Sequence, residues 1–105
     1  MKFSIADDVF ERVEEESLTQ AKDALSKGLY EEAEAIGVVT LIKAGIMTQL
    51  NLMGMDIWDK LRTPITVEEI SRMISSEYGI SYDECFCDVN EFVQDLFEKG
   101  FLKNE

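Results

Sequence analysis

The sequence predicts a small α+β fold of the winged-helix type, in which an antiparallel β-hairpin is followed by three helices. Two observations indicate this. Residues 38–51 hold two strand-like stretches separated by a glycine-containing connection, and residues 52–99 hold three amphipathic helical stretches separated by proline and glycine. A length of 105 residues suits one folded domain. We expect the main domain over residues 38–105 and an extra, acidic, partly helical segment over residues 1–37.

The first residues have a helical pattern. Ser4 followed by Asp7 resembles a helix cap, and Ile5, Val9 and Val13 recur at intervals of four. This spacing favours a helix at the N-terminus.

Two further helices are expected before residue 38. Ser17-Leu18-Thr19-Gln20 is a capping box, and the helix that it opens should end at Gly28. A second short helix is predicted from Tyr30 to Ile36, where Gly37 ends it.

The hairpin is predicted from two strands. Val38–Ile42 is a β-branched run, and Ile46–Asn51 alternates between two kinds of side chain. Lys43-Ala44-Gly45 would connect them as a three-residue turn in which the glycine takes a positive φ.

The first helix of the main domain is predicted from residue 52 to about Leu61. The side chain of Asn51 can cap it, and Trp58 would bury the largest apolar surface in the chain. Arg62-Thr63-Pro64 then ends it, because proline cannot continue a helix.

Local signals also delimit the second and third helices. Thr66-Val67-Glu68-Glu69 is a capping box that opens the second helix, which Gly79 ends. Ser81-Tyr82-Asp83-Glu84 opens the third, which should run to Lys99. Gly100 would be its left-handed cap, with Phe101 making the hydrophobic contact that often follows.

The ordered series Leu50-Asn51, Gly54 and Ile57-Trp58 resembles the signature of the family of pyrroloquinoline quinone biosynthesis protein D (PqqD), peptide chaperones also called RiPP recognition elements. The likeness continues through Thr66–Ile70, Asp88-Val89, Phe92, Leu96 and Gly100-Phe101-Leu102, and covers residues 38–105. It implies a binding module that holds the leader of a ribosomally synthesised precursor peptide and presents it to a radical S-adenosylmethionine enzyme. It also implies a first strand near residues 8–14, as an alternative to the N-terminal helix.

The resemblance places the peptide between the third strand and the third helix of the family, which match Ile46–Asn51 and Asp83–Lys99. An exposed sheet edge can accept an extended peptide as an additional strand. We expect backbone pairing by Met47, Thr48 and Gln49, and an apolar wall on the helix. The complete expected peptide-binding set is Ile46, Met47, Thr48, Gln49, Leu50, Cys85, Val89 and Phe92.

The apolar stripe of the third helix spans about 140° at 100° per residue, wider than the roughly 100° that packing on one side needs. One explanation is that a margin of the stripe lines a peptide groove. The other is that the helix is wedged between two elements of the core.

Net charge is −12, and both parts of the chain are acidic. Residues 1–37 hold four basic and ten acidic side chains, and residues 38–105 hold six and twelve. This balance disfavours nucleic acid and anionic membranes and favours a basic partner, unless it serves solubility alone. A DNA-binding winged helix is disfavoured because acidic side chains crowd the helix that would enter the major groove.

Catalytic and metal-binding patterns are missing from the sequence. It has no histidine and no phosphate-binding loop. Cys85 and Cys87 lie two residues apart on a predicted helix and so point to roughly opposite sides, which suits neither a shared metal nor an unstrained disulfide. We therefore expect no enzyme and no cofactor, with Cys85 buried and Cys87 exposed. There is no membrane span and no signal peptide, so a cytoplasmic location is expected. A generic protein-interaction domain without a modified-peptide client is the alternative function.

Overall fold

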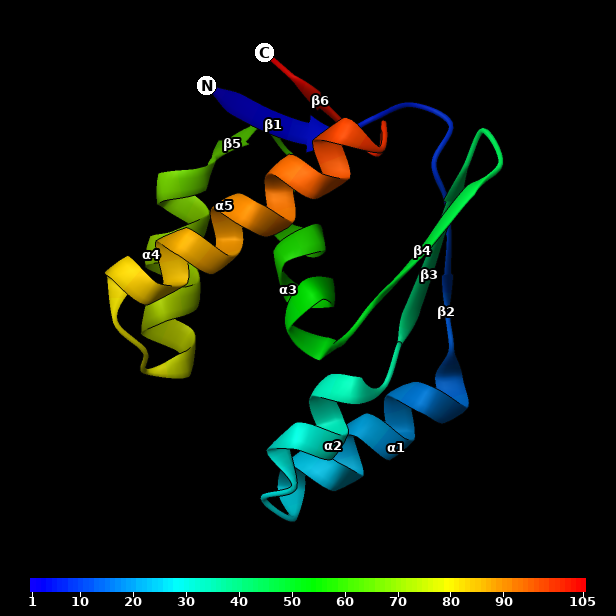
Figure 1. Cartoon of the computed structure of the whole chain (residues 1–105), viewed down its shortest axis with the longest axis vertical. Helices are drawn as coiled ribbons and strands as arrows, with labels where there is room; N and C mark the ends of the chain where they lie inside the picture. Colours follow the sequence, from blue (N-terminus) through cyan, green and yellow to red (C-terminus); the bar gives the residue numbers. More distant parts are fainter. The chain divides into compact units, whose positions relative to one another are not determined.

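The computed structural model describes all 105 residues, which form five helices and six strands (Figure 1). They group into two compact units, residues Asp8–Asp56 and residues Met1–Asp7 with Ile57–Glu105, which we call the hairpin unit and the helical unit. Helix α3 (Leu52–Lys60) contributes residues to both units. Small antiparallel sheets combined with helices confirm the predicted α+β fold class.

The hairpin unit contains a three-stranded antiparallel sheet in the order β2-β3-β4 (Figure 1). Its strands are β2 (Phe10–Val13), β3 (Val39–Lys43) and β4 (Ile46–Leu50). Strand β3 is central, and β2 and β4 are the two edges. The hairpin predicted from the sequence is therefore present, and β2 completes its sheet.

The turn between β3 and β4 is tighter than predicted. Lys43 and Ile46 pair directly, so only Ala44 and Gly45 connect the strands, with φ of 51° and 80°. The predicted three-residue connection is thus wrong, although the positive φ of Gly45 is confirmed. A two-residue turn with two positive φ angles is favoured because its twist matches that of the flanking strands.

Replacing Ala44 by Asn should stabilise the protein, because alanine is strained in the left-handed region whereas Asn-Gly is the preferred pair for this turn. We expect a gain of about 0.5–1 kcal/mol in the free energy of unfolding, measured by urea denaturation. Gly45→Ala is the matched control and should destabilise, because its φ of 80° then falls on a residue with a side chain. An unchanged midpoint for Ala44→Asn would contradict this account of the turn.

Helices α1 (Glu15–Ser26) and α2 (Tyr30–Ala35) form a helical hairpin between β2 and β3. The C-terminal end of α1 is closed at Gly28. The N–H of Gly28 donates to the carbonyl of Leu25 (3.0 Å), and the N–H of Leu29 donates to the carbonyl of Ala24 (2.9 Å). Both predicted helices are confirmed. However, α1 begins at Glu15 and not at the Ser17 capping box, because the first-turn hydrogen bond already runs from Leu18 to Glu14 (2.8 Å).

The predicted N-terminal helix is wrong. Ile5 belongs to strand β1 (Lys2–Ile5) and Val13 to β2, so the regular spacing of Ile5, Val9 and Val13 does not reflect one helix. Asp8 separates the two strands with a φ of 64°, a backbone conformation that an α-helix cannot contain. The alternative first strand near residues 8–14 is confirmed as β2.

The helical unit contains a second antiparallel sheet, in the order β5-β1-β6. Strand β1 lies between β5 (Ile65–Thr66) and β6 (Leu102–Asn104), so both ends of the chain lie side by side (Figure 1). The helical unit also contains α4 (Val67–Tyr78) and α5 (Tyr82–Glu98). The largest fully buried side chains of this unit are Trp58, Phe101, Leu61, Ile70, Ile74 and Leu96.

The predicted helix caps of the main domain are confirmed. The N–H of Gly54 donates to Asn51 Oδ1 (2.9 Å) at the start of α3, and Thr66 and Glu69 form the capping box of α4. Hydrogen bonds from the side chain and backbone of Thr66 lower the pKa of the Glu69 carboxyl. This box therefore stabilises the fold above the ordinary pKa of glutamate, and the contribution is lost as pH falls through the lowered value.

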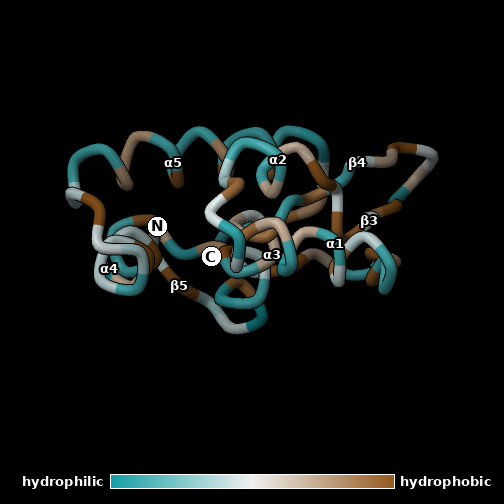
Figure 2. The backbone as a smooth tube through the Cα atoms, turned by 90° about the horizontal axis from the view of Figure 1, so that it is seen from below, coloured by the Kyte–Doolittle hydropathy of each residue, from teal (hydrophilic) through white to brown (hydrophobic).

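Helix α5 also ends as predicted. Gly100 has a φ of 88°, and the N–H groups of Gly100 and Phe101 donate to the carbonyls of Phe97 (3.0 Å) and Leu96 (2.9 Å). Hydrophilic and hydrophobic segments alternate along α5, as expected for an amphipathic helix (Figure 2). No helix in the structure combines the length and the apolar character needed to cross a membrane.

Candidate functional site

Strand β4 has a free edge. It pairs with β3 over its whole length, from Ile46 opposite Lys43 to Leu50 opposite Val39, and no other strand of the structure pairs with it. An unpaired edge leaves a row of backbone N–H and C=O groups that can accept a further strand. This free edge is the candidate binding site of the hairpin unit.

The pairing pattern shows which backbone groups point to that edge. The carbonyl of Leu50 accepts a hydrogen bond from the N–H of Val38 (2.7 Å), so the backbone of Leu50 faces β3. Because successive residues of an antiparallel strand alternate in direction, the backbone of Thr48 also faces β3. Met47 and Gln49 therefore direct their N–H and C=O groups toward the free edge.

The two edges of the sheet differ in charge. Strand β2 carries Glu11 and Arg12 at its centre, and charged side chains are a common protection against unwanted strand pairing. Strand β4 has the sequence Ile-Met-Thr-Gln-Leu, with neither charge nor proline. Only the β4 edge therefore combines free backbone groups with an uncharged strand.

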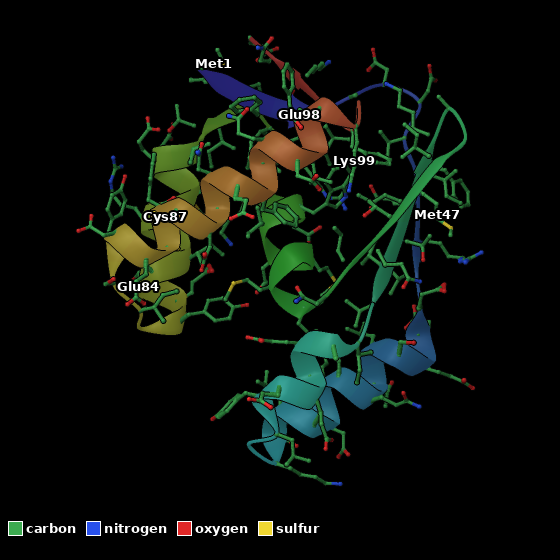
Figure 3. All side chains as sticks on the ribbon, in the orientation of Figure 1. Met1, Met47, Glu84, Cys87, Glu98 and Lys99 are labelled. Atoms are coloured by element: carbon green, nitrogen blue, oxygen red, sulfur yellow. The ribbon has the colours of Figure 1, made fainter.

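The side chains of β4 differ in exposure. Met47 is 65% exposed and extends away from the hairpin (Figure 3), Ile46 and Gln49 are exposed, and Thr48 is half-buried. Leu50 is buried. Gln49 lies back over the sheet, because its Nε2 donates to Thr40 Oγ1 (3.3 Å).

Helix α5 carries the other three predicted contact residues, and it begins at the Ser81 cap, whose side chain accepts from the N–H of Glu84 (3.3 Å). Cys85 and Val89 are each only 1% exposed, so they belong to the buried stripe of the helix. Phe92 is half-buried and does have accessible surface.

The two margins of the α5 stripe are not equivalent. Counted at about 100° per residue, Phe92 lies on one margin and Phe86 and Phe97 on the other. Phe97 packs edge-to-face on Phe3 of β1, with ring centroids 5.6 Å apart. That margin is therefore occupied within the helical unit, and Phe92 marks the other one.

The two cysteines have the expected exposures. Cys85 is buried and Cys87 exposed, and neither forms a disulfide. Burial raises the pKa of the Cys85 thiol, and the Asp88 carboxylate adds to the rise, whereas a hydrogen bond with the Ser75 backbone opposes it. The raised pKa favours the neutral thiol of Cys85. Separately, the structure contains no group of three potential metal ligands.

One feature near the site was missed in the sequence. Phe10 of β2 is 58% exposed, and it pairs with Ile42, which in turn pairs with Met47. Directly opposite residues of a sheet place their side chains on the same face, so these three form a row across one face. The signal was not detectable along the chain, because it depends on the register of three strands.

One family model matches most of the chain. Residues 29–102 match the family model described as coenzyme PQQ synthesis protein D (PqqD). The fold is similar to the solution NMR structure of the PqqD truncation of Methylobacterium extorquens PqqCD, described as a functional and stand-alone RiPP recognition element, with a TM-score of 0.65 and 12% sequence identity. That match covers 98% of this chain and 89% of the other. No curated protein sequence matches the chain.

Proposed function

Because this chain belongs to the PqqD family, we propose that it is a peptide chaperone that binds the leader of a ribosomally synthesised precursor peptide by strand addition. The free, uncharged edge of β4 is the observation that carries the proposal. A leader that is extended there would form main-chain hydrogen bonds with Met47 and Gln49. This mode of recognition obtains affinity from the backbone and specificity from alternate side chains.

Helix α5 is proposed to supply the apolar contacts of the leader. Phe92 has the accessible surface that this role needs, and it lies on the margin of the stripe that β1 does not occupy. Cys85 and Val89 would act from the buried side by holding α5 in place. On β4, Ile46, Thr48 and Leu50 alternate with the two pairing residues, and their side chains would line the other face of the same strand.

The chaperone is further proposed to present the bound precursor to a radical S-adenosylmethionine enzyme, as the family resemblance implies. In this arrangement the chemistry and any iron–sulfur cluster belong to that enzyme. The chain itself would act as a binding module and not as a catalyst.

Titration of the purified chain with the leader peptide encoded beside its gene tests the proposal. Calorimetry should show saturable binding, and amide shifts should cluster in residues 46–50 and around Phe92. A scrambled peptide of the same composition is the control, because a chain with a net charge of −12 attracts basic peptides regardless of their sequence. Equal binding of both peptides, or shifts confined to residues 14–37, would leave only a generic protein-interaction domain.

A further inference from the structure

The three residues Phe10, Ile42 and Met47, which we call the apolar row, cross one face of the β2-β3-β4 sheet and stop at its free edge. Phe10 and Met47 are among the most exposed large apolar side chains of the chain, with 58% and 65% of their surface accessible. Ile42 between them is half-buried. The row therefore has an open end at Met47, next to the backbone groups that the leader would pair with.

The next row of side chains on the same face is polar, and two of its members are already hydrogen-bonded to each other. Arg12 pairs with Thr40, and Thr40 with Gln49. The Gln49 side chain bonds Thr40 Oγ1 (3.3 Å) and lies against Gly37, where the Cβ atom of any larger residue would stand only 2.7 Å from Gln49 Oε1. Gln49 is thus directed back over β3, whereas Met47 makes no such polar contact.

We propose that the apolar row selects the leader: the residue that pairs with Met47 is apolar, and the residue two positions away, beside Gln49, is polar or small. This inference rests on the proposed strand addition. A strand added to β4 places one side chain beside Met47 on the exposed face, and such neighbours interact most favourably when both are apolar, aromatic or β-branched. Met47 would then be a specificity-determining residue, and the row would gain a fourth member when the leader binds.

The test is an aspartate scan of the leader encoded beside this gene, read against wild type and Met47→Lys. Each aspartate within the bound strand should weaken binding to the wild type. Met47→Lys should restore binding by about two- to fivefold at one position only, where the new lysine and the aspartate are cross-strand neighbours. That position should hold an apolar residue in the natural leader.

Phe10→Lys is the matched control. It adds the same charge to the same face, but three strand spacings from the leader, or about 14 Å. Because the screening length is about 8 Å at physiological salt, it should restore no single position. Circular dichroism checks that both variants remain folded.

The inference would be overturned if Met47→Lys restored binding at no position, or at a position where the natural leader has a polar residue. Neither outcome would contradict strand addition itself. Absence of leader binding to the wild type would instead overturn the proposed function, and the selection rule with it. The two failures are therefore distinguishable in one set of titrations.

Discussion

Replacing Trp58 by Ala is expected to lower the free energy of unfolding by about 3–5 kcal/mol. Trp58 is the largest fully buried side chain of the chain, with 1% of its surface exposed. Deleting it removes a large apolar surface from the core and leaves a cavity that the surroundings fill only in part. Since a domain of this size has about 5–15 kcal/mol of total stability, the variant should be close to unfolding at room temperature.

Urea denaturation followed by far-ultraviolet circular dichroism measures this loss. Fluorescence is unsuitable, because Trp58 is the only tryptophan and the substitution removes the probe. Trp58→Phe retains most of the buried ring and is the matched control, with a smaller loss expected. A loss below about 1 kcal/mol for Trp58→Ala would contradict the central place of this side chain in the core.

Replacing Gln49 by Pro is expected to weaken leader binding by about 5- to 150-fold relative to Gln49→Ala. Proline removes an N–H that points to the free edge, and the carbonyl of the leader that it would bond is left unpaired, at a cost of about 1–3 kcal/mol. The comparison with alanine removes the contribution of the Gln49 side chain and its hydrogen bond to Thr40. Calorimetric titration with the leader measures both affinities.

Thr48→Pro shows whether the assignment of backbone directions is right. The N–H of Thr48 faces β3, so proline there should disrupt the hairpin itself. Gln49→Pro should leave the fold intact, because proline is tolerated in an edge strand where its nitrogen faces outward. Equal affinities of Gln49→Pro and Gln49→Ala for the leader would exclude strand addition at this edge.

Features encoded by a few neighbouring residues were predictable from the sequence. The capping box at Thr66 and Glu69, the caps at Asn51 and Ser81, and the left-handed Gly100 each depend on contacts within one helical turn. The family resemblance rests on the same local pattern from Leu50 onward and correctly indicated the family. The strand character of residues 46–50 was also readable, because alternation is a local property.

Features that depend on distant partners were not predictable. Strands β1, β5 and β6 are two to four residues long. They exist because β1 pairs both with β5, from the middle of the chain, and with β6, at its other end. Ile5, Val9 and Val13 favour a helix by spacing alone, but pairing of β1 with β6 and of β2 with β3 overrides that preference. Tertiary pairing prevailed because short segments hold little intrinsic preference of their own.

The same distinction between local and long-range features applies to the residues of the candidate site. Local patterns in the sequence were enough to predict a strand at residues 46–50 and, at residues 82–98, an amphipathic helix with an apolar stripe. The folded structure was needed to show that β4 is an edge, that the backbone groups of Met47 and Gln49 face outward while those of Thr48 face β3, and that Val89 is buried while Phe92 keeps accessible surface. The physical reason is that edge position, backbone direction and burial are properties of the neighbours that a residue acquires on folding, which its own identity does not specify.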